Sequence, residues 1–378
     1  MKILVIPTTD WIRHPVPNRL NFIFDILAER HEVFVLHFTI GQFSNNFPRP
    51  TQCGLIESGP FPMKDPSLYY LLNAPFHLIS ILKSLQRNQI DIIVSANILP
   101  SFFAAVQGTP VVFDYLDHLE ESASVYYPGS VAGKIIRNVV KAITRFNLRH
   151  ASSIITVSRD FSKYLEADGF SHIRIVPNGV DTGTLRPIPT DDAKQKLGLE
   201  GPVLGYVGSL EYWIDLESVV ASLPSLDAKL LVVGPGLFTD YGEQIQALAE
   251  DLGVTNRVVF TGPVPFSDLG LYISAMDIGL NPLKKMAKNE MTVGGKVFNY
   301  LACGKPVLSS RMRALEHMLG DALFYYDDTE SFARMVKAIL VSPGDPSRYR
   351  DLALNYDWKD IAIEYETVLL SAKGRSIP

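Results

Sequence analysis

A glycine-rich loop and a lysine open an apolar helix in TVGGKVFNYLACGKPVLSS, residues 292–310. Gly294 and Gly295 let the backbone approach a ligand closely, and Lys296 adds a full positive charge at the expected start of the helix. Free backbone N–H groups and the helix dipole favour an anion at that position. Gly304 follows the helix, where a residue with positive φ is favoured. The stretch predicts a phosphate site; the alternative is an ordinary surface lysine on a core helix.

Several other nucleotide and hydrolase motifs are absent from the sequence. Without G-x-x-x-x-G-K-[ST] or G-x-G-x-x-G, neither a P-loop enzyme nor a dinucleotide site is supported. The lack of H-E-x-x-H, of G-x-S-x-G and of any Cys/His cluster argues against zinc and serine hydrolases. No Asp-x-Asp pair occurs that could hold a nucleotide's metal. We therefore expect no metal, with phosphate charge met by helix ends and basic side chains.

The composition is typical of a globular chain with two domains. Of 378 residues, 47% are apolar and 20% are charged. A net charge of -5 argues against a nucleic-acid partner. The two cysteines, Cys53 and Cys303, favour a reducing cytoplasm over a disulfide framework. The first apolar run is too short for a signal peptide, and no run is long enough to span a membrane, so any membrane role would be peripheral.

The elements that must position these residues are short apolar strands that alternate with amphipathic segments. The expected strands are KILVI, EVFVLHF, IDIIVSAN, TPVVFDYLD, SSIITVS and HIRIVPN, then PVLGYVGSL, AKLLVVGPG, RVVFTG, DIGLNPL, KPVLSS and ALFYY. Strands that are apolar along their whole length are typical of parallel sheets covered on both faces. We predict an α/β fold with two doubly wound, Rossmann-like domains, residues 1–182 and 183–355. A C-terminal helix, residues 356–378, is expected to bridge both domains.

Four segments in the chain occur in a recognisable order. They are IVPNGVD, GYVGSLEYWIDLE, RVVFTGPVPFSDLGLYISAMDIGLNPL and KVFNYLACGKPV. Together they resemble GT-B-fold glycosyltransferases, most of all glycosyltransferase family 4 and its relatives that build surface polysaccharides and glycolipids. The resemblance covers residues 151–370 well and the first 150 residues loosely. It implies two domains that face each other across a cleft, with the acceptor bound by the first domain and a nucleotide sugar by the second.

The resemblance also implies which residues hold the donor, a UDP- or GDP-linked sugar, with no cofactor required. The diphosphate would lie over Gly208 and Ser209, after the first strand of the second domain, and near Lys296. Backbone groups around Gly262 to Val264 would hold the nucleobase. Residues 177–179, Pro-Asn-Gly, would shape the hinge, although Asn-Gly is also a common turn dipeptide.

The sequence departs from the family pattern at two places. Ser209 and Ile214 stand where many relatives have an arginine and a lysine that contact the diphosphate. Met291 and Asn299 stand where many relatives have a pair of glutamates. These departures leave open how the sugar hydroxyls are recognised and whether configuration is retained. They also keep open a non-catalytic relative that binds a nucleotide sugar. A nucleotide-sugar epimerase on the same fold is a further alternative, but it needs acid/base carboxylates, and their absence at these positions argues against it.

Polar residues follow two strands of the first domain, where an acceptor is expected. Asp10, Trp11, Arg13 and His14 follow the first strand, and Asp114, Asp117, His118 and Glu120 follow TPVVF. Glycosyl transfer needs a group that removes or orients the acceptor's hydroxyl proton. Asp117 is the first candidate, because relatives place an acidic residue or a histidine there, and His118 is the second. A polar loop role is the alternative for both.

A stripe of cations marks one further segment, residues 133–152. Lys134, Arg137, Lys141, Arg145 and Arg149 recur every three or four residues, opposite an apolar face that includes Ile135 and Val139. One interpretation is an ordinary surface helix whose apolar face belongs to the core. The other is contact with anionic lipid headgroups, which would bring the enzyme to a lipid-linked or glycan acceptor on the inner face of the cell membrane. The sequence fixes neither the sugar, the base, the acceptor, the stereochemical outcome nor the oligomeric state.

Overall fold

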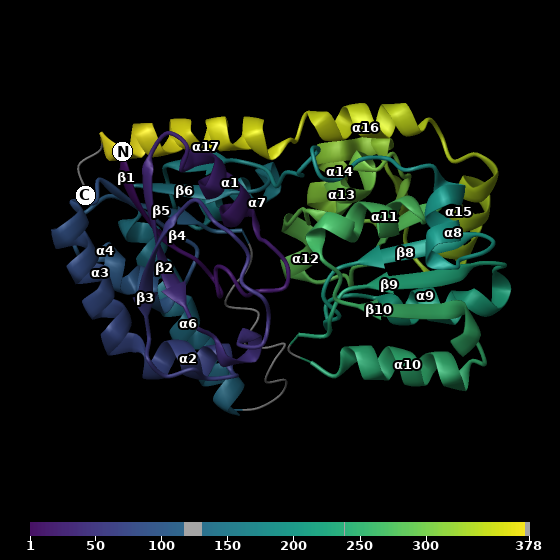
Figure 1. Cartoon of the computed structure of the whole chain (residues 1–378), viewed down its shortest axis with the longest axis horizontal. Coiled ribbons are helices and arrows are strands. Elements are labelled where there is room, and N and C mark those ends of the chain that lie inside the picture. Colours follow the sequence, from purple (N-terminus) through teal and green to yellow (C-terminus); the bar gives the residue numbers. More distant parts are fainter. Residues whose placement is uncertain (117–130, 238, 375–378) are drawn as a thin grey trace. The chain divides into compact units, whose positions relative to one another are not determined.

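The computed structural model describes residues 1–116, 131–237 and 239–374. They form two compact units, Met1–Pro177 with Lys359–Pro378, and Asn178–Trp358. Each unit is a parallel sheet covered by helices (Figure 1). The α/β fold with two Rossmann-like domains is therefore confirmed.

The first unit contains a seven-stranded sheet in the order β3-β2-β1-β4-β5-β6-β7. Its strands are β1 Lys2–Ile6, β2 Glu32–Phe38, β3 Gly54–Ser58, β4 Ile92–Ser95, β5 Val111–Asp114, β6 Ser153–Thr156 and β7 Ile173–Ile175. The order reverses at β1, which pairs with both β2 and β4, and ligands in such sheets bind at the carboxyl ends beside this reversal. The loop after β1, which holds Asp10, begins there.

The sequence pattern correctly predicts six of these strands and misses β3. That strand lies at the edge of the sheet, and its residues GLIES are mostly exposed or half-buried. An edge strand that is open to solvent has no need of an apolar run, so hydrophobicity cannot reveal it.

Helices of the first unit cover both faces of its sheet. They are α1 Arg19–Leu27, η1 Gly41–Phe43, α2 Pro66–Leu72, α3 Ala74–Asn88, α4 Leu99–Ala105, α6 Val131–His150 and α7 Arg159–Ala167. The last helix, α17 Trp358–Lys373, joins this unit from Lys359 onward. It packs on α1 through an edge-to-face contact between Tyr365 and Phe24, whose ring centroids are 5.6 Å apart.

The second unit contains a six-stranded sheet in the order β10-β9-β8-β11-β12-β13. Its strands are β8 Val203–Val207, β9 Lys229–Val233, β10 Val258–Gly262, β11 Ile278–Asn281, β12 Val307–Ser310 and β13 Phe324–Tyr326, all six predicted. Here the order reverses at β8, which pairs with β9 and β11. Ligands are therefore expected at the carboxyl ends of β8 and β11.

The helices of the second unit are short for the most part. They are α8 Thr190–Leu197, α9 Leu216–Ser222, η2 Leu223–Ser225, α10 Tyr241–Asp251, η3 Thr255–Arg257, η4 Phe266–Asp268, α11 Leu269–Ser274, α12 Ala287–Met291, α13 Lys296–Ala302, α14 Arg313–Leu319, η5 Gly320–Ala322, α15 Thr329–Val341 and α16 Pro346–Leu354. Alternate residues of β8 enter two separate cores, with Val203 and Val207 on one face and Leu204 and Tyr206 on the other.

Two further findings concern the chain as a whole. Cys53 and Cys303 are both free and buried. In the part of the chain that the structure describes, no helix is long and apolar enough to cross a bilayer.

Candidate functional site

Lys296 is the first residue of α13, and its amine points back to the carboxyl end of β8. The Lys296 Nζ atom donates a hydrogen bond to the Tyr206 hydroxyl at 3.1 Å and lies 4.2 Å from the centre of that ring. Tyr206 in turn donates to the backbone oxygen of Ser209 at 2.7 Å. Burial lowers the pKa of Lys296 to about 7. The site therefore holds a half-buried lysine whose ammonium form is weakened by desolvation and supported by the Tyr206 ring.

The turns after β8 and β9 each begin with a glycine, and the two glycines lie side by side. Gly208 and Gly234 have φ values of +143° and +139°. A Cβ atom on Gly234 would lie 2.1 Å from the backbone oxygen of Gly208, which no side chain tolerates. A Cβ atom on Gly208 would lie 3.2 Å from Lys296 Nζ. The structure thus brings Gly208, Ser209 and Lys296 together, which is the grouping that the family resemblance implies.

Gly262 adds a third glycine turn at the same edge of the sheet. It ends β10 with a φ of +68°, and its backbone oxygen accepts a hydrogen bond from Gly234 N at 3.0 Å. Val264 is half-buried against the core on the α13 side of the sheet. The predicted nucleobase residues therefore lie two strands away from β8, connected to the Gly208 turn through Gly234.

Gly294 and Gly295 do not have the backbone conformation that only glycine favours. Gly295 is the N-cap of α13, with φ −60° and ψ −23°, and neither residue has positive φ. A Cβ atom on Gly294 would meet nothing within 4 Å. What these glycines provide is open space. Because α13 has only seven residues, we assign most of the positive potential to Lys296 and little to the helix dipole.

The segment Pro177-Asn178-Gly179 holds the loop before α13 in place. Asn178 Nδ2 donates to the backbone oxygen of Val293 at 2.8 Å. A Cβ atom on Gly179 would lie 2.7 Å from the Tyr356 backbone oxygen, so glycine is required there by packing. The Asn-Gly pair therefore has a structural role within the second unit.

Two side chains beside the β8 turn belong to the site although no sequence pattern marks them. Lys288, on α12, is nearly buried, and its Nζ lies 4.1 Å from the centre of the Trp213 ring. Glu211 is fully buried and accepts a hydrogen bond from Thr239 Oγ1 at 3.1 Å. Both fix the loop that follows Ser209. Ile214, in that loop, is itself buried.

Asn299 and Met291 stand where many relatives have glutamates, and the structure shows the surroundings of both positions. Asn299 is half-buried in α13. Glu290, next to Met291, accepts a hydrogen bond from the backbone N–H of Arg313 at 3.1 Å. That carboxylate therefore caps the start of α14.

In the first unit, Asp10 organises the loop after β1. It is buried and accepts hydrogen bonds from the backbone N–H groups of Ile12 and Arg13 at 3.1 and 2.8 Å. His37 lies between two carboxylates, 3.2 Å from Asp10 and 2.9 Å from Glu57. Burial opposes both charges, but hydrogen bonding between His37 and Asp10 lowers the pKa of Asp10, and both carboxylates raise the pKa of His37.

The other predicted acceptor residues differ in exposure. Trp11 is fully buried and donates from Nε1 to Thr51 Oγ1 at 3.1 Å, so its side chain shapes the loop. Arg13 is half-buried, and its backbone oxygen accepts a hydrogen bond from Asn46. His14 packs edge-to-face on Phe43, and burial lowers the pKa of its ring.

Asp114 ends β5 as part of a buried ion pair. Its Oδ2 lies 3.3 Å from Arg19 Nε, and both side chains are almost fully buried. Burial raises the pKa of Asp114, and the charge of Arg19 opposes that rise. Asp117 and His118, the predicted catalytic residues, lie outside the described residues.

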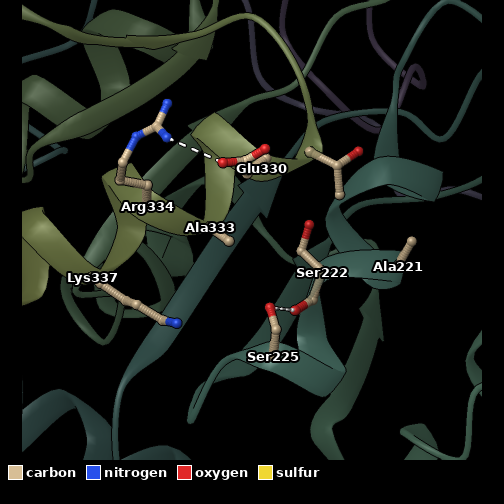
Figure 2. A pocket seen from close by; sticks show the side chains of 8 residues that line it. Ala221, Ser222, Ser225, Glu330, Ala333, Arg334 and Lys337 are labelled. Carbon is tan, nitrogen blue, oxygen red and sulfur yellow. Dashed lines mark hydrogen bonds and ion pairs between the residues drawn. The ribbon is translucent and has the colours of Figure 1, made fainter.

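A separate hollow of about 660 Å³ lies between α9 with η2 and the helix α15. Figure 2 shows Arg334 paired with Glu330 on α15, with Ser222 of α9 and Ser225 of η2 on the other side of the hollow. No predicted site residue lines this hollow, whose wall is made of small and exposed polar side chains. Among the described residues, no group of three or more His, Cys, Asp or Glu could hold a metal ion.

Comparison with known proteins gives two family matches. Residues 25–184 match the model described as "Glycosyltransferase Family 4", and residues 201–342 match "Glycosyl transferases group 1". A 2-deoxystreptamine glucosyltransferase from Streptomyces kanamyceticus is 29% identical over 237 residues, 58% of this chain and 59% of its own length. An alpha-monoglucosyldiacylglycerol synthase from Streptococcus pneumoniae is 25% identical over 278 residues, 68% of this chain and 60% of its own. The chain thus spans about three fifths of these relatives.

Solved structures share the fold over nearly the whole chain. A sucrose-phosphate synthase from Thermosynechococcus elongatus has a TM-score of 0.78 at 18% identity, covering 98% of this chain and 99% of its own. The Anabaena protein HepE in complex with UDP-glucose has a TM-score of 0.74 at 19% identity, covering 98% and 100%. At these identities the likeness shows the GT-B fold alone.

Proposed function

Because this chain belongs to the glycosyltransferases that combine a family 4 domain with a group 1 domain, we propose that it transfers a sugar from a nucleoside-diphosphate sugar to a glycan, glycolipid or lipid-linked acceptor. Such a reaction would serve the synthesis of cell-surface polysaccharides or glycoconjugates. Among the relatives, the Streptococcus pneumoniae synthase has a glycolipid name, which supports this acceptor class.

The observation that carries the proposal is the amine of Lys296 next to the Gly208 turn. Transfer leaves a nucleoside diphosphate with added negative charge, and a cation fixed at that point stabilises it more in the transition state than in the substrate. A Cβ atom on Gly208 would lie only 3.2 Å from Lys296 Nζ, so the amine is close to the backbone of the turn. The lysine and the glycine turn can therefore contact the same phosphate group.

We propose a UDP- or GDP-linked donor, and the UDP-glucose complex of HepE favours UDP as the first to test. We also propose that the reaction needs no metal, because a lysine and backbone N–H groups at the turn can meet the diphosphate charge. On the acceptor side, Asp117 and then His118 remain the proposed bases. We place the protein in the cytoplasm, where two free cysteines stay reduced.

A donor screen tests the proposal directly. The chain is incubated with UDP- and GDP-sugars, with and without a chelator, and mass spectrometry follows nucleoside diphosphate release and sugar transfer. We expect turnover of one donor that the chelator leaves unchanged. Binding of UDP or GDP without any turnover would instead identify a non-catalytic relative, and a changed sugar on the intact donor would identify an epimerase. Turnover that the chelator abolishes would refute metal independence but would leave the proposed sugar transfer standing.

A further inference from the structure

The first unit exposes large apolar side chains on two consecutive helices. On α2 and α3 these are Leu68, Leu71, Leu72, Phe76, Ile79 and Leu82, with Leu71 64% exposed. Their spacing places them on the outward side, opposite buried residues such as Tyr69 and Ile81. A soluble surface carries scattered apolar residues, but a contiguous set of this size marks an interaction surface.

Helix α6 presents a second apolar face. Val131, Ile135 and Val139 are 73%, 59% and 52% exposed, and Ile136 is exposed as well. The sequence-based alternative that this face belongs to the core is therefore wrong for the first half of α6. Its cations form a stripe along one flank of that face, and a helix whose exposed surface is part apolar and part basic suits a membrane interface.

The two apolar faces belong to one side of the unit. Helix α4 packs against both α3 and α6, so the helices form one layer. In Figure 1, α2 and the start of α6 lie at the same end of this unit. We call the exposed apolar and basic side chains of α2, α3 and α6 the helical face.

Charge distinguishes this face from the rest of the molecule. The chain carries a net charge of -5, yet α2, α3, α4 and α6 contain no aspartate or glutamate. Exposed Lys83 and Arg87 end α3, and α6 adds the five cations of its stripe. Of these five, Arg145 is paired with Asp168 at 2.7 Å. A strongly basic surface on an acidic protein is complementary to an anionic partner.

We propose that the helical face docks on a bilayer that contains anionic lipid. Lysine and arginine beside exposed leucine, isoleucine and phenylalanine match charged headgroups above an acyl layer. Nucleic acid would leave the apolar side chains without a partner. A protein partner is favoured less, since its interfaces are rich in tyrosine, tryptophan and methionine and poor in lysine. The inference goes beyond sugar transfer and does not depend on it.

Vesicle co-sedimentation of the full chain tests the proposal. Vesicles are made of phosphatidylcholine alone or with phosphatidylglycerol, at low and high salt. We expect binding to the anionic vesicles that weakens as salt rises. Lys134→Gln/Arg137→Gln/Lys141→Gln should weaken that binding on the order of a hundredfold, since each surface cation is worth about fivefold. Ile135→Gln/Val139→Gln should weaken it on the order of tenfold.

The matched control is Lys196→Gln/Lys337→Gln/Arg348→Gln, which removes three exposed cations from the second unit. It should bind vesicles like the wild type, which excludes a mere effect of net charge. Equal binding to neutral and anionic vesicles, or no binding, would overturn the proposal. So would light scattering that shows dimers broken by Ile135→Gln/Val139→Gln, because the occupant would then be a second copy. UDP binding should be unchanged in every variant, which separates this result from the test of sugar transfer.

Discussion

Replacing Lys296 by methionine should weaken nucleoside diphosphate binding while the fold stays intact. The substitution removes the ammonium group and keeps an apolar stem of similar length. A charge-assisted hydrogen bond contributes about 1.5–3 kcal/mol, so UDP affinity should fall by roughly ten- to a hundredfold at pH 6.5. The Tyr206 ring, 4.2 Å from the amine, keeps its place in the core and limits structural change.

The same lysine gives the binding a characteristic pH dependence. Burial lowers the pKa of Lys296 to about 7 in the free protein. The diphosphate binds the ammonium form, so affinity is greatest below pH 7 and falls by about tenfold for each pH unit above it. The decline stops at the pKa of the complex, which the bound anion raises. Lys296→Met has no such group and should show a flat profile.

Isothermal titration with UDP at pH 6.5, 7.5 and 8.5 measures both effects. Above pH 7 the wild type should also take up a proton on binding, which buffers of different ionisation enthalpy reveal. The control is Lys285→Met, because Lys285 is an exposed lysine 3.7 Å from Asp327. The reasoning fails if Lys296→Met binds UDP like the wild type, or if it keeps the wild-type slope with pH.

Three further substitutions test the fold around the two candidate sites. Gly234→Ala should destabilise the protein by about 2–4 kcal/mol in urea unfolding, because the new Cβ would clash with the Gly208 backbone oxygen at a residue that already has positive φ. Gly236→Ala is the control and should be nearly neutral, since the nearest atom to its Cβ is 3.5 Å away. His37→Gln should cost most stability near pH 5 and less as pH rises above 6.5, because the raised pKa of His37 stabilises the fold only while the ring is protonated; a constant cost between pH 5 and 8 would contradict this. Arg19→Met should cost about 3–5 kcal/mol by leaving Asp114 buried without its cation, and adding Asp114→Asn should recover part of that loss.

The sequence predicted those strands that are buried on both faces of a sheet, because such strands consist of apolar residues. Val203–Val207 and Lys229–Val233 are apolar runs between turn signals, and Gly304, with φ +71°, ends α13 as predicted. The same rule fails for β3, because an exposed edge strand need not be apolar. Apolar periodicity also gave the wrong environment for the first half of α6, since an amphipathic helix has the same pattern whether its apolar face is buried or exposed.

The side-chain contacts within the candidate sites could not be predicted from the sequence pattern. Tyr206 lies inside an apolar strand, and nothing in its spacing indicates that its hydroxyl accepts a hydrogen bond from Lys296, ninety positions later. His37 likewise stands in a buried strand, and only the sheet brings it between Asp10 and Glu57. Such contacts depend on strand order, which periodicity does not encode. Gly208 and Gly304 were easier to predict, because each directly follows the end of an apolar run.

The two lysines of residues 292–310 differ in what surrounds their amines, and that difference supports the proposed anion site. Lys305 is buried, and its Nζ donates to Thr190 Oγ1 at 2.6 Å; burial lowers its pKa to about 8, while nearby acidic groups such as Asp277 oppose the shift. Within the described structure, burial is the one cause that lowers the pKa of Lys296, and no carboxylate opposes it. A fold that shields an amine beside an open glycine turn and supplies no counter-charge leaves that charge for a ligand to provide. A diphosphate at Gly208 would supply it.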